Sequence, residues 1–436
     1  MTIEIELKFI ATPDAVSQLA QTLADFPHQH QAAQALSNTY FETDDNQLRR
    51  WDMGLSIRGV DSHYEMTLKT AGKTLGGLHQ HAEYNIDLPE PELDIARLPA
   101  EVWPHRTDVA ALQARLQPLF STHFQRETWL VQTGGSEVEV VLDRGAVTTE
   151  TVSEDLFEVK LELKSGQHSD IMSFAQQLIG TGGLRLGSLS KAARGHQLAQ
   201  GNPPRLLRPF PLLKAAPKAT VEEGMVTAMS SALSHWQYHE EVWLRGNPDA
   251  QRSVVEALEA LRQAFSLFGA LVPRKASSEL RQKLTALEET LAEPVKDVQA
   301  LSFSALSVET QLALTHWLME FQWRRWIDAR SLAKLDGSFK HFSDIMLSRI
   351  AADLKETFSD VQQANEYHDK ATRLSRQLLA VHLLAGTYAP EAVVVWLAPW
   401  QDLQHSIAQN QDRWLKSLAS QAIRQPAFWL NSSAAR

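Results

Sequence analysis

The first residues of the chain alternate between charged and apolar side chains. In MTIEIELKF the charged positions are Glu4, Glu6 and Lys8. The apolar positions between them are Ile3, Ile5, Leu7 and Phe9. Because side chains alternate between the two faces of a strand, this pattern predicts a β-strand with one apolar and one charged face. An edge strand with a solvated outer face has the same pattern, so only the rest of the chain can distinguish the two interpretations.

Short alternating segments of this kind continue through the first 200 or so residues. They include LSIRGV, HYEMTLKT, EYNIDL, RETWLVQT, EVEVVLDRGAV and LFEVKLELKSG, with Gly, Asp and Ser between them. Such segments predict a mainly antiparallel sheet that closes on itself. Helical periodicity in AVSQLAQTLADF and SDIMSFAQQLIG predicts helices that flank this sheet.

A proline-rich stretch divides the chain. Residues 201–220 hold five prolines, too many for a continuous helix, and we expect them to form a linker. After it, apolar residues such as Val254, Leu258 and Leu261 recur every three or four positions, which predicts amphipathic helices. The expected fold class is α+β, with a closed antiparallel β-barrel in residues 1–200 and an all-α helical bundle in residues 221–436.

Composition restricts the chemistry of both halves. The chain has no cysteine, which excludes disulfides, thiolate zinc sites and cysteine nucleophiles. Its formal net charge is −10, with 20 Lys and Arg against 27 Asp and Glu in residues 1–220, so we expect no general nucleic-acid binding. The sequence shows neither a secretory signal nor a run of membrane-spanning length, so we expect a cytoplasmic protein that does not enter a membrane.

Charged residues also alternate in predicted strands other than the first. In EVKLEL, Glu158, Lys160 and Glu162 share a face, as do Ser56 and Arg58 in LSIRGV. If the sheet closes into a barrel, alternate residues of every strand point inward and together line a polar tunnel. Carboxylates on some strands and amines on others suit a metal-bound polyanion, because the acids hold divalent cations and the bases bind phosphate oxygens. Without sulfur ligands, Mg²⁺ or Mn²⁺ is the expected metal.

These segments resemble a known family. Glu4-Ile5-Glu6-Leu7-Lys8 is similar to the E-x-E-x-K signature of CYTH domains, the triphosphate tunnel metalloenzymes, whose fold is a closed antiparallel barrel of about eight strands. It is followed in order by YFET, LSIR, TLK, LDRG, EVKLELKSG and SLSKAARG, over roughly 200 residues. The resemblance implies a divalent-metal-dependent phosphohydrolase that acts on a linear triphosphate.

The resemblance also implies roles for individual residues. Glu4, Glu6 and Lys8 would be catalytic, with the two carboxylates binding metal or positioning the attacking water. The residues implied to bind metal are Glu4, Glu6, Asp143, Glu158 and Glu162. The residues implied to bind the phosphates are Lys8, Arg58, Lys69, Arg126, Arg185, Lys191 and Arg194.

Three positions depart from the family pattern. Ser56 stands where an LRIR motif would place a further Arg, and His81 with Asn85 weakens an R-x-E-x-E motif. Lys160 replaces the middle Glu of an E-x-E-x-E strand. We expect this loss of a carboxylate to reduce metal affinity, although Glu158 and Glu162 remain on the same face.

The helical half resembles a CHAD domain, a module that commonly follows CYTH domains in bacteria and is associated with polyphosphate binding. The stretch RSVVEALEALRQAFSLF keeps Arg262, but Glu256 and Glu259 stand where bases are expected. We therefore interpret this half as a degenerate binding module or an interaction domain. The candidate remnants of a polyanion site, each also explicable as an ordinary surface or core residue, are His235, His239, His341, Arg324 and Arg325.

The leading functional hypothesis is hydrolysis of inorganic triphosphate, with inorganic triphosphate or polyphosphate as the ligand. A tunnel enzyme that acts on an organic triphosphate, as an adenylate cyclase or a thiamine triphosphatase does, is a second hypothesis. The third is a protein that binds polyphosphate without cleaving it, and the departures at Ser56 and Lys160 keep it open.

Overall fold

The computed structural model describes residues 2–430, with side chains from residue 4 onward. The side chain of Ile3 and the last six residues of the predicted helical domain therefore lie outside the described part. The chain divides into two compact units. The first runs to Arg205 and includes the later segment Asp297–His316, and the second holds Leu206–Lys296 and the residues from Trp317 onward.

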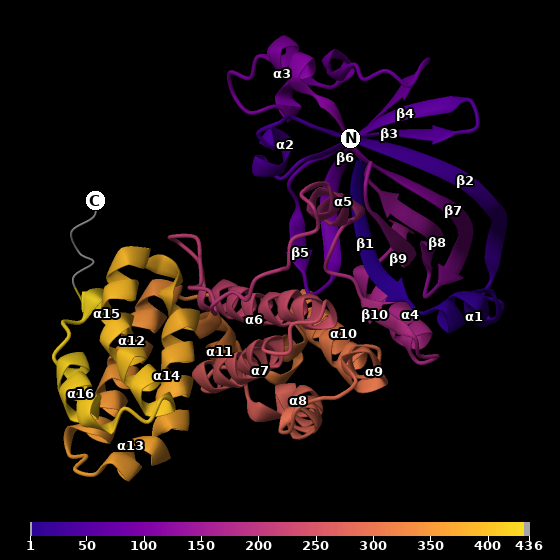
Figure 1. Cartoon of the computed structure of the whole chain (residues 1–436). Coiled ribbons are helices and arrows are strands. Elements are labelled where there is room, and N and C mark those ends of the chain that lie inside the picture. The colour runs from indigo at the N-terminus through magenta and orange to yellow at the C-terminus, as the bar shows by residue number, and fades with distance from the viewer. Residues whose placement is uncertain (1, 431–436) are drawn as a thin grey trace. The chain divides into compact units, whose positions relative to one another are not determined.

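Eight antiparallel strands close into a barrel in the first unit (Figure 1). Their order around the barrel is β1-β9-β8-β7-β2-β3-β4-β6, and β6 pairs back to β1. Two short strands, β10 and β5, extend the edges of β1 and β6. The strand bounds are β1 Thr2–Ala11, β2 His28–Glu42, β3 Gly54–Val60, β4 His63–Lys69, β5 Lys73–Leu75, β6 Leu78–Leu88, β7 Gln117–Thr133, β8 Ser136–Thr148, β9 Ser153–Ser165 and β10 Leu184–Leu186. The predicted closed barrel is confirmed.

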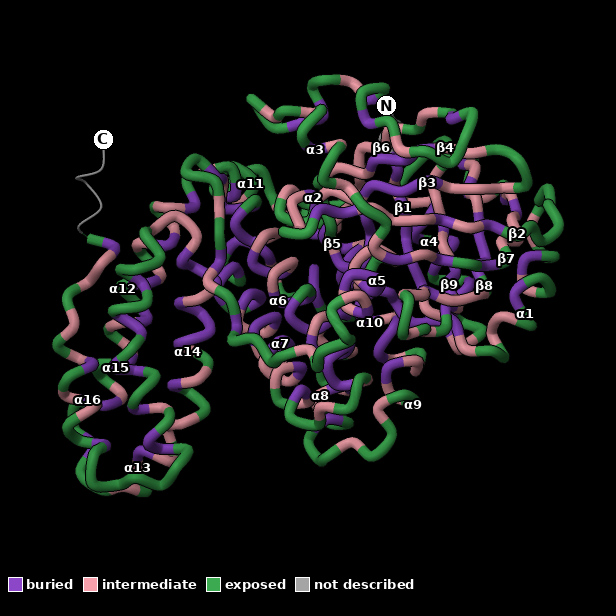
Figure 2. The backbone as a smooth tube through the Cα atoms, turned by 45° about the horizontal axis from the view of Figure 1, so that its top comes forward, coloured by how far each residue is buried: buried purple, intermediate pink, exposed green. Residues whose placement is uncertain are grey.

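Strand β1 lies inside the sheet and is not an edge strand. It pairs with β6 and β9 on its two sides. Leu7 and Phe9 are fully buried, and on the charged face Glu4, Glu6 and Lys8 are only 7%, 5% and 5% exposed. The alternative of a solvated edge strand is therefore wrong, because both faces of β1 are withdrawn from water (Figure 2).

Helices and an irregular segment cover the outside of the barrel. Helix α4, His168–Ile179, packs against β7, β8 and β9 with a fully buried apolar face that includes Ile171 and Phe174. The outer faces of β3 and β4 pack against residues from 95–112, including Ile95 and Leu112. The other helices of this part are α1 Pro13–Leu23, α2 Gln47–Arg50, α3 Val109–Arg115 and α5 Lys191–Ala199.

The carboxylate of Glu42 fixes the short helix α2. It accepts hydrogen bonds from the backbone N–H groups of Thr43, Leu48 and Arg49, at 2.8 to 2.9 Å. These bonds satisfy donors at the start of the helix that have no partner within it. The acid of the YFET motif therefore has a structural role at the end of β2.

The second unit is helical, as expected. Residues 202–216 form neither helix nor strand. The first unit also includes two helices from the later part of the chain, namely α9, Val298–Ser302, and most of α10, Ala305–Met319. The expected division into domains 1–200, 201–220 and 221–436 therefore remains a prediction. Within residues 2–430, no helix combines the length and apolar character needed to cross a membrane. The remaining helices are α6 Val221–Leu244, α7 Ala250–Leu267, α8 Ser278–Leu291, α11 Ala329–Leu335, α12 Phe339–Ser359, α13 Ala364–Asp369, α14 Ala371–Leu384, α15 Pro390–Ala408 and α16 Leu415–Ile423.

Candidate active site

A cavity of about 420 Å³ lies inside the barrel. Its walls come from seven of the eight barrel strands and from α5. Seven Lys or Arg side chains and three carboxylates line it, although the chain as a whole has a net charge of −10. The basic lining residues are Lys8, Arg49, Arg58, Lys69, Arg126, Lys160 and Lys191. A local excess of positive charge of this kind attracts polyanions.

Three glutamates form the first carboxylate cluster: Glu4, Glu6 and Glu162. The ammonium of Lys160 lies among them, with its Nζ 2.7 Å from Oε1 of Glu4, 3.2 Å from Oε2 of Glu6 and 3.1 Å from Oε2 of Glu162. Lys69 donates to the other oxygen of Glu4 at 2.5 Å. Strand register produces this arrangement, because Glu6 of β1 pairs directly with Glu162 of β9.

The charges in the first carboxylate cluster stabilise one another. Burial raises the pKa of Glu6, but Lys160 and Lys69 outweigh burial and lower this pKa to about 2. The same balance lowers the pKa of Glu4. Burial disfavours the charged form of Lys160, yet Glu6 and Glu4 raise its pKa well above the usual value for lysine. All three side chains are therefore ionised at neutral pH.

Asp143 and Glu158 form the second carboxylate cluster. They pair directly across β8 and β9, and each is only 1% exposed. Arg126 binds both oxygens of Asp143 at 2.8 Å, and Lys191 lies 2.8 Å from Asp143 and 2.6 Å from Glu158. Burial raises the pKa of both acids, but the cations, with Lys191 foremost, outweigh it and lower both pKa values. Oε2 of Glu158 is buried and accepts no hydrogen bond within the described residues.

Helix α5 carries Lys191 to the tunnel. Ser190 caps the helix by accepting a hydrogen bond from the N–H of Ala193 at 3.0 Å. Gly195 lets the helix approach β7, because a Cβ at this position would lie 2.1 Å from the ring of Phe120. The Ser and Gly of the SLSKAARG motif thus place the first turn of α5 beside the second carboxylate cluster.

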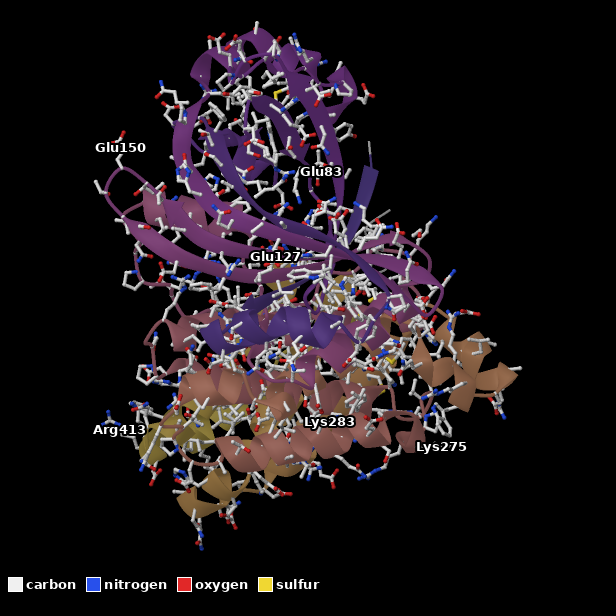
Figure 3. The ribbon with its side chains drawn as sticks, turned by 90° about the vertical axis from the view of Figure 1, so that its right-hand side faces the viewer. Glu83, Glu127, Glu150, Lys275, Lys283 and Arg413 are labelled. Carbon is white, nitrogen blue, oxygen red and sulfur yellow. The ribbon has the colours of Figure 1, made fainter. Side chains whose placement is uncertain are left out.

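Lys8 differs from the other cations of the tunnel. It lines the cavity and is 5% exposed, but no described residue makes a hydrogen bond or ion pair with its ammonium. Arg58 donates a hydrogen bond to Asn38 at 3.3 Å and lies 3.7 Å from the carboxylate of Glu65. Lys69 is shared between Glu4 and Glu83, which is labelled in Figure 3. Lys8 is therefore a buried tunnel cation that feels the charges of Glu6 and Glu158 without being hydrogen-bonded to them, and it can bind an anion.

Two of the arginines implied to bind phosphate lie elsewhere. Arg194 donates to the carboxylate of Glu154 at 2.8 Å and to the carbonyl of Asp155 at 2.6 Å. The guanidinium of Arg185 lies 5.6 Å from the centre of the Phe303 ring. Among the described residues, neither lines the cavity, whereas Lys8, Arg58, Lys69, Arg126 and Lys191 all do.

Several lining residues were not identified from the sequence. Asn38 and Tyr40 of β2 face the cavity at alternate positions just before and within YFET, a spacing that could have indicated them. His79 also lines it, and burial followed by the nearby Lys8 lowers its pKa to about 4, so it is neutral at pH 7. The departing residues Ser56 and His81 are lining residues too.

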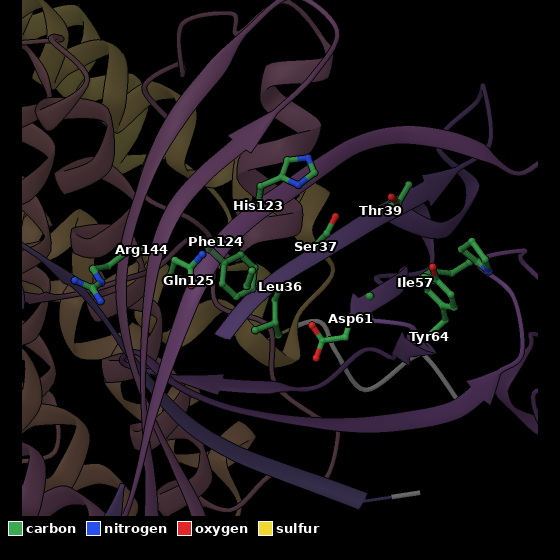
Figure 4. Close-up of a pocket in the computed structure, with 13 residues that line it drawn as sticks. Leu36, Ser37, Thr39, Ile57, Asp61, Tyr64, His123, Phe124, Gln125 and Arg144 are labelled. Carbon is green, nitrogen blue, oxygen red and sulfur yellow. The ribbon is translucent and has the colours of Figure 1, made fainter. Parts of the chain in front are cut away.

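A larger hollow of about 630 Å³ lies across β2, β3 and β7 (Figure 4). It gathers only two charged side chains, Asp61 and Arg144. Arg144 already pairs with Glu127 at 3.6 Å. The inner cavity is therefore the stronger candidate for a polyanion.

Three of the basic residues that the sequence singled out in the helical half are paired with acids. Arg262 makes two 2.9 Å bonds to Glu288, and Arg324 pairs with Glu222. His235 lies 3.2 Å from Glu256. The acids neutralise these three bases, which leaves less positive charge to attract a polyanion. Polyanion binding by the helical half therefore stays an untested prediction.

Two family models match the chain. The CYTH domain model matches residues 2–196, and the CHAD domain model matches residues 227–419. The chain therefore contains a CYTH domain followed by a CHAD domain, as the sequence motifs indicated. An inorganic triphosphatase of Haemophilus influenzae is 38% identical over 200 residues, which is 45% of this chain and 54% of that protein. The chain thus matches about half the length of this relative.

Solved structures resemble each part. A Hippeastrum protein described as having a dominant triphosphatase activity is 17% identical, with a TM-score of 0.34, over 44% of this chain and 95% of its own. The CHAD domain of Ricinus communis is 21% identical, with a TM-score of 0.36, over 50% of this chain and 86% of its own. Because both TM-scores are below 0.5, these likenesses support no conclusion about function.

The triphosphate tunnel enzymes are metal-dependent, and the two carboxylate clusters differ in how well they suit a cation. The second cluster suits one, because two buried carboxylates face each other and Oε2 of Glu158 has no hydrogen-bond donor among residues 2–430. In the first cluster, all three carboxylates are already in contact with Lys160. Lys191 likewise contacts both acids of the second cluster, but it reaches them from the first turn of helix α5, whereas Lys160 lies among all three carboxylates of the first cluster. The residues present therefore fit a divalent cation better at Asp143 and Glu158 than at the first cluster.

We expect the protein to lose stability as pH falls from about 5 to 2, because an unfolded glutamate titrates near 4.3. The pKa of Glu6 in the fold is about 2. A lowered pKa contributes stability that is present above the unfolded pKa and lost as pH falls through the folded pKa, here on the order of 2–3 kcal/mol. Urea midpoints measured across this range check the expectation, and Glu6→Gln should show a shallower dependence. A Glu6→Gln profile as steep as the wild type would contradict it.

Proposed function

We propose that this protein is a cytoplasmic hydrolase that converts inorganic triphosphate to pyrophosphate and phosphate with the help of Mg²⁺ or Mn²⁺. The observation that carries the proposal is the excess of basic side chains around one cavity of the barrel that is also lined by Glu6 and by Glu158, the strand-pair partner of Asp143. The similarity to a protein named inorganic triphosphatase supports the same reaction.

The basic residues bind and orient the triphosphate. Lys8 is free to contact phosphate oxygens directly. Arg126 and Lys191 neutralise Asp143 and Glu158 in the structure described here, and their donors can turn to phosphate when a substrate enters. This exchange leaves the two carboxylates available to hold the divalent cation, which, when bound, neutralises charge on the phosphate oxygens.

Glu6 positions the attacking water. It lines the cavity and is ionised, and its Oε2 accepts no hydrogen bond within the described residues, so a water can share this oxygen with the Lys160 ammonium, which lies 3.2 Å away. A carboxylate of this kind accepts a hydrogen bond from water and directs the water oxygen toward phosphorus. A bond from that oxygen to the terminal phosphorus forms as the bond to the bridging oxygen breaks. Pyrophosphate leaves, and the proton of the water passes to the phosphate products.

The proposal is tested by measuring phosphate release from tripolyphosphate, ATP and thiamine triphosphate with Mg²⁺ or Mn²⁺. We expect the fastest release from tripolyphosphate and none in excess EDTA, because the second carboxylate cluster needs a bridging cation to approach the substrate. Faster release from either organic triphosphate would assign the tunnel to that substrate. Tight binding of tripolyphosphate without release would show a non-catalytic polyphosphate-binding protein.

The Lys8→Ala variant is expected to raise KM for tripolyphosphate about tenfold or more, since it removes a buried ammonium that contacts ground-state phosphate. Steady-state kinetics measure the effect. Lys73→Ala provides the control, because Lys73 of β5 is exposed and does not line the cavity. An unchanged KM in Lys8→Ala would remove this residue from the binding site.

A further inference from the structure

The position of Lys160 is the clearest departure of this tunnel from its family motif. Its side chain is 13% exposed, and its ammonium lies within 3.2 Å of carboxylates from Glu4, Glu6 and Glu162. An ammonium has three hydrogen-bond donors, and here three carboxylates surround it. The chain thus carries a positive charge at the centre of the cluster where the family motif would supply another acid.

We propose that the ammonium of Lys160 is a built-in cation that fills the first carboxylate cluster, so that the tunnel takes up a divalent cation only at the second. The inference rests on the proposed function in one respect, namely that a divalent cation enters the tunnel at all. It assigns to a side chain the neutralising role that a bound metal ion would otherwise have at Glu4, Glu6 and Glu162.

Charge and geometry both exclude a second ion from this cluster. A divalent cation among the same carboxylates would lie within a few ångströms of the Lys160 ammonium, and the two positive charges would repel each other strongly at that distance in a poorly solvated site. Oε1 of Glu4 and Oε2 of Glu162 are also already used by this ammonium. Lys69 occupies the remaining oxygen of Glu4.

The Lys160 ammonium is covalently attached to the chain, so it cannot dissociate from the first carboxylate cluster as a metal ion can. Lys160 lies on β9 directly opposite Lys8 of β1, in the middle of a paired strand. Its charge is therefore present at the cluster whatever the concentration of free metal, and a chelator cannot remove it. The first carboxylate cluster should remain neutralised and folded in EDTA.

The test counts Mn²⁺ ions bound to the full chain without substrate, by calorimetric titration and by electron paramagnetic resonance of free Mn²⁺. We expect Lys160→Glu to bind about one more Mn²⁺ per chain than the wild type, because the cluster then has four carboxylates and no ammonium. Its melting temperature should also rise more on addition of Mn²⁺ than that of the wild type. An equal number of ions in both proteins would overturn the inference.

Two further variants keep the test decisive. Lys160→Gln removes the ammonium without adding a carboxylate, so it should also gain an Mn²⁺ site, and it decides the matter if Lys160→Glu does not fold. Lys164→Gln is the matched control, because Lys164 lies on the same strand and pairs with Glu162 at 3.0 Å but is 40% exposed. It should bind as many Mn²⁺ ions as the wild type. A gain in Lys164→Gln equal to that in Lys160→Gln would overturn the inference, because any nearby loss of charge would then suffice.

The ion-counting experiment and the hydrolysis assay can fail independently of each other. A wild type that hydrolyses no triphosphate while Lys160→Glu gains an ion would refute the hydrolase and support the built-in cation. A wild type that hydrolyses tripolyphosphate while neither Lys160 variant gains an ion would support the hydrolase and refute the built-in cation.

Discussion

Glu158→Gln is expected to reduce the turnover of tripolyphosphate by about 10²-fold or more, the size of loss that follows removal of one group from a preorganised charged site. Glu158 is buried beside Asp143, and its Oε2 has no hydrogen-bond donor within the described residues. An amide keeps the size of the side chain but loses the negative charge that a divalent cation needs. Turnover at saturating tripolyphosphate, measured over a range of Mn²⁺ concentrations, checks this expectation.

Asp155→Asn is the control for Glu158→Gln. Asp155 lies on the same strand, but its side chain is exposed and does not line the cavity. The control should keep wild-type turnover, and melting temperatures should show that both variants are folded. Full activity in a folded Glu158→Gln would mean that the second carboxylate cluster does not hold the cation.

Glu6→Gln is expected to lower kcat for tripolyphosphate by about 10²-fold or more while changing KM much less. In the proposed mechanism Glu6 directs the attacking water and does not bind the phosphates, so its loss should affect the transition state more than the ground state. Stopped assays of phosphate release at several substrate concentrations separate kcat from KM.

Glu127→Gln is the matched control for Glu6→Gln. Glu127 is a carboxylate of β7 that pairs with His30 at 2.8 Å and does not line the cavity (Figure 3). Its substitution should leave kcat unchanged. If Glu6→Gln also retained its kcat, the water would be positioned by another group and the mechanism proposed for Glu6 would be wrong.

Much of the barrel could be predicted from the sequence because local alternation decides which residues of a strand face inward. Glu6, Lys8 and Glu158 were identified as inward-facing in this way, and all three line the cavity. The motif SLSKAARG likewise predicted the presence of Lys191 at the site. These features depend on neighbouring positions in the chain, so a single sequence contains them.

Features that depend on register between distant strands could not be predicted. The sequence showed that Lys160 replaces a glutamate, but only the pairing of β1 with β9 places its ammonium among Glu4, Glu6 and Glu162. Arg185 lies against Phe303, more than 100 positions later in the chain, a contact that no local pattern indicates. The helical periodicity after the linker predicted helices, but it did not predict that residues 297–316 group with the barrel unit.

The closure of the barrel by β1 also affects the order in which the protein folds during synthesis. β1 precedes the other barrel strands in the sequence, and its partners on β6 and β9 lie about 75 and 150 positions later. Glu4 and Lys160, which are 156 positions apart, can therefore meet only after nearly the whole first unit has been made. Until then β1 presents unpaired backbone groups and the apolar side chains of Leu7 and Phe9 to the cell. Among the barrel strands, the one that carries the E-x-E-x-K motif therefore has the longest sequence separation from its first partner strand.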